Sequence, residues 1–224
     1  RNIPAEALVG STDNYGNVES LGALYAAFGA KYVALDLSGY TDLAVISGVY
    51  AVTEAAEARK HLAGIILPEG LTSIGNYAFK ETALSSITFP AGLSSIGTNA
   101  FEKTKLTSLD LRGTGVTVIN TQAFRDCASL KTVYLPEGLT TIDRFGFGYC
   151  ASLETIHFPS TLTSVDEAAF EEVTSLRHVV LHAAFTDDDL FKVLALQKDT
   201  TFALTGTGSL HTNDDGKILL RDTG

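Results

Sequence analysis

The chain has 224 residues and a net charge of −10, from 26 acidic and 16 basic side chains. This balance argues against nucleic acid and anionic lipid as partners, because phosphate binding requires clustered Lys and Arg. Hydrophobic residues make up 45%, too many for a disordered chain. No apolar run reaches the roughly 18 residues that a membrane helix needs. The chain contains no methionine and begins at Arg1, so we expect any signal peptide to lie outside this sequence.

The N-terminal third predicts a cap followed by an atypical repeat. In residues 18–28 the apolar side chains fall on one helical face, with Asn17 as the N-cap and Gly29 as the C-cap. The stretch "YVALDLSG" at 32–39 then predicts a first strand. A longer repeat follows, in which "TEAAEARKHL" predicts a helix that begins after Thr53.

The central part of the chain repeats every 22 or 23 residues. Each copy contains the pattern L-x-x-I-x-L, which alternates as a strand does, and Pro usually follows. A fixed period of this length predicts a solenoid, because one unit cannot bury its apolar side alone. Each copy also ends in a phenylalanine, and we expect these rings to form one buried row: Phe79, Phe101, Phe124, Phe147 and Phe170.

The segments between the strands complete each copy. We expect "GLTTI" and its equivalents to point Leu and Ile inward, and one short turn, or a single helical turn, to bring each Phe into the core. Glu102 and Lys103 fall on the outer side of this turn, and we expect their replacement by Ala to leave ligand binding unchanged.

The C-terminal segment departs from the repeat, as the end of a solenoid must. Thr186 is a good cap for a helix over "DDDLFKVLALQ", and acidic residues at a helix start favour the positive end of its dipole. Two β-like runs, "TFAL" and "KILL", flank a turn at 213–216 and predict a closing hairpin.

The repeats resemble the BspA-like, or treponemal-type, leucine-rich repeat family of bacteria. The stretches "LPEGLTSIGNYAF" from 67 and "CASLKTVYLPEGLTTI" from 127 match its pattern closely, and the match extends over 62–182 and weakly over 31–46. The resemblance implies a surface or secreted protein that acts in adhesion or partner binding and has no catalytic activity. The ligand does not transfer, because members of so broad a family bind different partners.

The repeats and the resemblance together predict an α/β repeat solenoid. In this leucine-rich repeat, short parallel strands line the concave face, a helix caps the N-terminus, and a helix with a hairpin caps the C-terminus. The predicted divisions are 1–30 for the N-terminal cap, 31–182 for the solenoid and 183–224 for the C-terminal cap. Within the solenoid, 43–67 is the atypical repeat and 68–181 holds the regular ones.

Enzyme and metal motifs are weak in this sequence. Cys127 and Cys150 lie one repeat apart, where equivalent side chains point the same way, so we predict two buried, reduced thiols. Glu154, His157 and His178 are candidate ligands for a zinc ion, but we favour the simpler interpretation that they are exposed polar residues on the surface of a sheet. No nucleophile elbow or calcium loop is present. We therefore predict no enzyme activity, no metal and no cofactor.

The outward positions of the strands form columns across the repeats, and we predict that they bind a protein or glycan ligand, including host extracellular or matrix components. Tyr134 beside His157 is the proposed anchor, because aromatic and hydrogen-bonding side chains dominate binding energies. The open alternatives are plain sheet surface and a structural module that self-associates through residues such as Ile66 and Val180. The candidate residues are Asp36, Ile66, Thr88, Asp110, Tyr134, His157, His178 and Val180.

Overall fold

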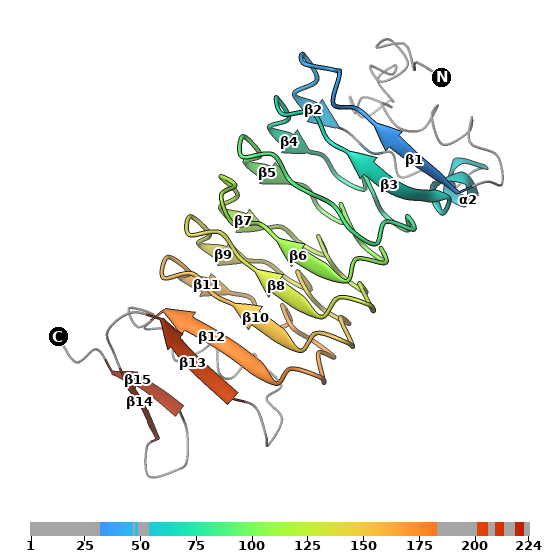
Figure 1. Ribbon diagram of the computed structural model, residues 1–224. Coiled ribbons are helices and arrows are strands. Elements are labelled where there is room, and N and C mark those ends of the chain that lie inside the picture. Colours follow the sequence, from blue (N-terminus) through green and yellow to red (C-terminus); the bar gives the residue numbers. More distant parts are fainter. Residues whose placement is uncertain are drawn as a thin grey trace.

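The computed structural model describes residues 32–46, 48, 54–182, 201–205, 209–212 and 218–221. The chain winds into a solenoid whose strands stack along its length (Figure 1). Each regular coil has three sides: a front strand, a second strand and a segment of tight turns that carries the Phe. We number the coils from the first strand, so that coils 2 to 6 are residues 62–83, 84–105, 106–129, 130–152 and 153–175.

The front strands confirm the predicted parallel pairing. Strand β1 (Val33–Asp36) pairs with β3 (Leu62–Ile66), and a separate five-stranded sheet follows further along the solenoid. We call both together the front sheet. The strands of the five-stranded part are all parallel: β6 (Ser108–Asp110), β8 (Thr132–Tyr134), β10 (Thr155–His157), β12 (His178–His182) and β13 (Thr201–Thr205).

The second side of each coil is also a strand, which the sequence analysis did not predict. These strands are two residues long, and their apolar residue points into the core, as Ile142 does. They form two parallel groups, the first with β2 (Val45–Ile46), β4 (Ser73–Ile74) and β5 (Ser95–Ile96), the second with β7 (Val118–Ile119), β9 (Thr141–Ile142) and β11 (Ser164–Val165).

The third side consists of turns, and the α/β assignment needs correction here. The described residues contain a single helix, α2 (Glu54–Arg59), within the longer repeat where a helix was predicted. In four of the five regular coils the residues two before and two after the Phe have positive φ, such as Phe145 at 57° and Tyr149 at 63°, and around Phe170 only Glu172 does. A helix cannot continue through such residues. Alternate N–H groups instead donate to the next coil, so that Phe147 N–H bonds Ala169 O at 2.9 Å.

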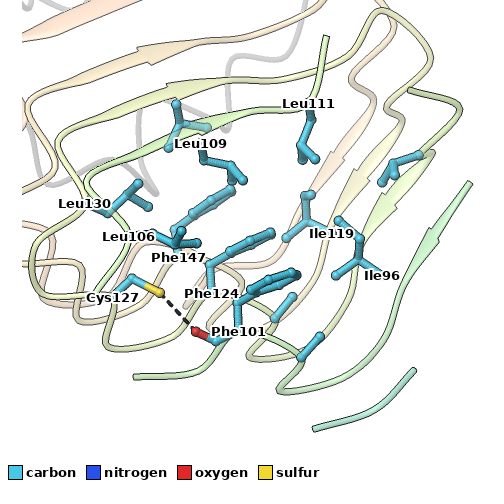
Figure 2. Close-up of a cluster of buried hydrophobic side chains, with 14 of the residues drawn as sticks. Ile96, Phe101, Leu106, Leu109, Leu111, Ile119, Phe124, Cys127, Leu130 and Phe147 are labelled. Carbon is cyan, nitrogen blue, oxygen red and sulfur yellow. Dashed lines mark hydrogen bonds between the residues drawn. The ribbon is translucent and has the colours of Figure 1, made fainter. Parts of the chain in front are cut away.

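The five phenylalanines form the predicted continuous row, which we call the Phe spine. Successive rings are stacked, with centroids 5.2 Å apart for Phe79 and Phe101, and 5.6 Å for Phe147 and Phe170. All five side chains are fully buried. Figure 2 shows three of these rings lying parallel, between the front-strand leucines on one side and Ile96 and Ile119 on the other.

The two cysteines are free and buried, as predicted. Cys127 Sγ donates to Phe101 O of the preceding coil at 3.2 Å (Figure 2), and Cys150 Sγ donates to Phe124 O at the same distance. Burial raises the pKa of the Cys150 thiol well above its ordinary value. Each thiol therefore satisfies a carbonyl between coils, and this position holds a buried Thr in earlier coils.

The front sheet is interrupted in coil 3, where "LSSITFP" was expected to form a strand. Residues 84–90 form no strand, although Leu84 is buried. Within the described part of the chain, Ser85 O accepts from Thr107 N–H, but the N–H groups of Ile87 and Thr88 have no hydrogen-bond partner. The second side of the same coil is regular, since β5 pairs with β4.

The chain ends differ from the prediction where they are described. The run "TFAL" belongs to β13, which extends the front sheet through parallel pairing with β12. The hairpin is present, but β14 (Ser209–Thr212) rather than "TFAL" pairs with β15 (Ile218–Arg221). The helices predicted at 18–28 and 187–197 lie outside the described residues, and the boundaries of the two caps stay predictions.

Glu102 was predicted on the outer side of the turn, but its side chain is buried; its effect on ligand binding stays a prediction. Its side chain is 3% exposed, and its two oxygens bind Lys80 Nζ at 2.8 Å and Arg125 Nη1 at 3.1 Å, while Asn99 donates a third hydrogen bond. Burial favours the neutral acid, but the bonds from Lys80 and Asn99 and the charges of Lys80 and Arg125 outweigh it. They hold the pKa of Glu102 below its usual value.

Phe147→Ala should lower the free energy of unfolding by about 3–5 kcal/mol, because it opens a cavity in the middle of the Phe spine. Phe145→Ala is the matched control, since this neighbouring ring is only half-buried, and it should cost clearly less. Chemical denaturation of the two variants measures both effects. Equal destabilisation by the two substitutions would contradict the spine as the main core contact.

Glu102→Gln should destabilise the protein by about 2 kcal/mol at neutral pH, because two cations lose a charged partner. The lowered pKa of Glu102 means that its contribution is present above about 4.5 and is lost as the pH falls through the folded pKa. Denaturation curves between pH 7 and pH 3 should therefore converge for the parent and the variant. A difference that stays constant with pH would show that the carboxylate charge is not responsible.

Candidate ligand-binding face

The predicted column of outward positions lies in register within each of the two parts of the front sheet, but Thr88, between them, belongs to no strand. Asp36 pairs with Ile66, and in the second part Asp110 pairs with Tyr134, Tyr134 with His157, and His157 with Val180. These side chains leave the sheet opposite the core, since the residues between them, such as Val133 and Ile156, are fully buried. Strand alternation thus places the candidates as the sequence predicts.

The centre of this column is a stack of three side chains from three successive coils. The rings of Tyr134 and His157 lie parallel, with centroids 4.3 Å apart and planes inclined by 26°. The guanidinium carbon of Arg112 lies 4.2 Å from the centroid of Tyr134. By strand order Arg112 and His157 flank Tyr134 on opposite sides. We call this group the Arg112–Tyr134–His157 row.

Arg112 was missed by the sequence analysis, although the pattern contains a signal for it. In the neighbouring coils Pro follows the last apolar residue of the front segment, as Pro90 follows Phe89 and Pro136 follows Leu135, but Arg112 follows Leu111. Pro has no N–H, whereas Arg112 has one, and that N–H donates to Asp110 Oδ1 at 3.1 Å. Asp110 therefore terminates the strand in place of a proline.

Asp110 also holds the Arg112 side chain in position. Arg112 Nε donates to Asp110 Oδ1 at 2.9 Å and Nη2 donates to Oδ2 at 2.6 Å, a two-pronged contact that fixes the plane of the guanidinium. The Arg112 hydrogen bond is the main reason that the pKa of Asp110 is lowered. Asp36 makes a similar turn, since it accepts from Ser38 N–H at 3.0 Å.

The remaining candidates lie away from the row. Asp36, Ile66 and Thr88 line a shallow groove of about 320 Å³ where the front sheet is interrupted, and Ile66 is 56% exposed. His178 is in the adjacent column, with its ring nitrogen Nδ1 bonded to the Thr201 hydroxyl at 2.5 Å. The structure thus brings together Asp110, Tyr134, His157 and Val180, with His178 on the same strand as Val180, and separates them from Asp36, Ile66 and Thr88.

The row favours a neutral His157. Partial burial lowers the pKa of this imidazole, and the positive charge of Arg112 lowers it further. At neutral pH the row therefore carries one cation, and its partner Asp110 carries one anion. Such a surface can form hydrogen bonds and stacking contacts. Among the described residues no group of three His, Cys, Asp or Glu side chains could hold a metal ion, and no described helix is long and apolar enough to cross a membrane.

Comparison with known families assigns the repeats. The model of the BspA-type leucine-rich repeat region matches residues 54–188 in six copies. The chain belongs to the BspA-type leucine-rich repeat family. No curated protein matches its sequence. The row therefore lies on the front side of coils 4 to 6 of a BspA-type repeat array.

Three solved structures are similar to this BspA-type array. A leucine-rich repeat protein from Bacteroides ovatus is 19% identical with a TM-score of 0.39, and a leucine-rich cell surface protein from Faecalibacterium prausnitzii is 20% identical with a TM-score of 0.32. The pneumococcal vaccine antigen PcpA is 15% identical with a TM-score of 0.31. The matches cover 77%, 77% and 79% of this chain, but only 54%, 63% and 63% of those proteins.

Removing the charge of Arg112 should raise the pKa of His157, because only burial then opposes protonation of the ring. In the parent the lowered pKa means that His157 contributes less to stability as the pH falls below 6.5, since the unfolded chain binds the proton more readily. NMR titration of the imidazole in Arg112→Gln measures the shift. Arg144→Gln, with the same charge change over Phe145 on the turn side, should leave the titration of His157 unchanged.

Proposed function

We propose that this chain is a non-enzymatic binding module that engages a protein or glycan ligand through the front sheet. The observation that carries the proposal is the Arg112–Tyr134–His157 row. Three side chains of types that dominate binding energies stack on an outward face, where the core does not require them. A sheet surface without a binding role needs only Ser, Thr or Val at such positions.

Pre-organisation supports the role of the row in binding. Asp110 fixes the guanidinium of Arg112, and the guanidinium and His157 hold the ring of Tyr134 between them. Little side-chain entropy remains to be lost on binding, which is a main cost of forming an interface. Because both faces of the Tyr134 ring are occupied, a ligand meets its edge and hydroxyl together with the free side of His157. This favours polar contacts and hydrogen bonds.

The location that fits this function is the cell surface or the extracellular medium. Family membership supports it, and the F. prausnitzii protein is described as a cell surface protein. We extend the proposal to adhesion, with ligands that include host extracellular and matrix components. The wider column, with Asp36, Ile66, Thr88, His178 and Val180, would form the periphery of such an interface.

Replacing Tyr134 and His157 together by Ala should weaken binding to a true partner at least tenfold, or about 1.4 kcal/mol. Partners captured on the immobilised parent protein from an extracellular protein and glycan panel provide the ligand, and surface plasmon resonance gives the affinities. The matched control is Phe145→Ala with Tyr149→Ala, a half-buried aromatic pair on the turn side. If the control abolished binding and the front pair had no effect, the turn side would be the site.

A structural, self-associating module is the second candidate function. It is favoured by one observation, the exposed Ile66 beside the groove at the interrupted sheet. Light scattering over a concentration series separates the two functions. A mass that rises with concentration in the parent but not in Ile66→Lys would support self-association. A monomer throughout would remove it.

A further inference from the structure

A hollow lies on the solenoid beside two successive coils whose segment between the Phe and the next front-side leucine is one residue shorter than in later coils. We call this segment the corner of the coil. From the Phe to the next front-strand leucine the chain takes five steps in the early coils, as from Phe79 to Leu84, but six in later coils, as from Phe124 to Leu130. Two such short corners follow each other, and between them and the start of β1 lies a hollow of about 450 Å³. Its lining residues are Tyr32, Lys60, Glu81, Thr82, Ala83, Lys103 and Lys105.

The hollow is positive on a strongly negative protein. Three ammonium groups line it, against the single carboxylate of Glu81, while the whole chain has a net charge of −10. Next to the lining, Lys60 Nζ pairs with Glu57 Oε1 at 2.7 Å, and both of these side chains are exposed. Lys105 has no hydrogen bond or ion pair within the described part of the chain. Lys103 Nζ and Glu81 Oε1 are 3.6 Å apart, a long and partly exposed contact. Such exposed pairs contribute little, so an anionic ligand can replace them at small cost.

One wall of the hollow is aromatic. Tyr32 is 72% exposed, more than any other described large apolar side chain. His61 touches this ring edge-on, with the ring centroids 5.4 Å apart and the planes inclined by 68°. The electron-rich face of an aromatic ring attracts weakly positive C–H groups, which the face of a sugar ring presents. A volume of about 450 Å³ is within the range of small-ligand sites.

We propose that this hollow binds an acidic saccharide. The carboxylate or sulfate of one sugar unit would lie among Lys60, Lys103 and Lys105, and a sugar ring would pack against Tyr32. The Thr82 hydroxyl cannot donate to this ligand, because it donates to Phe79 O at 2.8 Å. An acidic peptide would satisfy the ammonium groups but would leave the tyrosine without a role, so the ring favours the saccharide.

Calorimetric titration with defined probes tests this site. Trigalacturonate carries carboxylates, a heparin-derived tetrasaccharide adds sulfates, and fully methyl-esterified trigalacturonate keeps the sugar rings without the charge. We expect at least one of the two acidic probes to bind, and the ester to bind at least tenfold more weakly. Which acidic probe binds identifies the anionic group. Binding of neither, or equal binding of the ester and the acid, would overturn the proposal.

Variants locate the site and separate it from the front sheet. Lys103→Gln with Lys105→Gln, and separately Tyr32→Ala, should each weaken binding at least tenfold. Lys131→Gln with Arg144→Gln removes the same charge elsewhere and should have no such effect. Arg112→Gln should also retain saccharide binding, so that failure of this site and failure of the front-face proposal are distinguishable. Triglutamate that binds as tightly as the saccharide, or a Tyr32→Ala variant with unchanged affinity, would show a charge-only or peptide site and would refute the saccharide.

Discussion

The stacking of one phenylalanine per coil is the contact on which the rest of the solenoid depends. The rings of the Phe spine are stacked at successive separations of 5.2, 5.3, 5.5 and 5.6 Å, close to the spacing of the parallel strands on the other two sides. A coil can therefore gain or lose a residue only at a corner. The extra Gly113, with a φ of 78°, and the short corners before Leu84 and Leu106 are changes of this kind.

Much of the fold could be predicted because each repeat of the sequence forms one coil of the structure. The Phe spine, the parallel front strands, the buried thiols and the register of the outward column all follow from spacing and alternation. Two-residue strands do not show as alternation, so the second side was missed. The third side resembles a helical turn in composition, and only the positive φ at residues such as Tyr149 distinguishes it.

The candidate site could be predicted in part, for reasons that individual residues make clear. Tyr134 and His157 lie one period apart at the same strand position, so their contact follows from the repeat. Arg112 lies two residues beyond Asp110, outside the strand, and its approach to Tyr134 depends on the turn that replaces a proline. The hollow beside Tyr32 combines residues from three coils and the start of β1, a set that no single motif contains.

The interrupted front sheet gives the solenoid a mechanical seam. Coil 3 has no front strand to pair with β6 of coil 4, and the second-side groups also separate, between β5 and β7. The side chain of Asn120 donates to Ile96 O at 2.7 Å there, whereas in the next coil the backbone N–H of Asp143 donates to Ile119 O. The stack of Phe101 on Phe124, the bonds of the turn side, and isolated bonds from Thr107 N–H to Ser85 O and from Gly115 N–H to Leu93 O carry the connection. Under a pulling force along the solenoid, coils 4 to 6, which carry the Arg112–Tyr134–His157 row, would stay intact while the array yields at this seam.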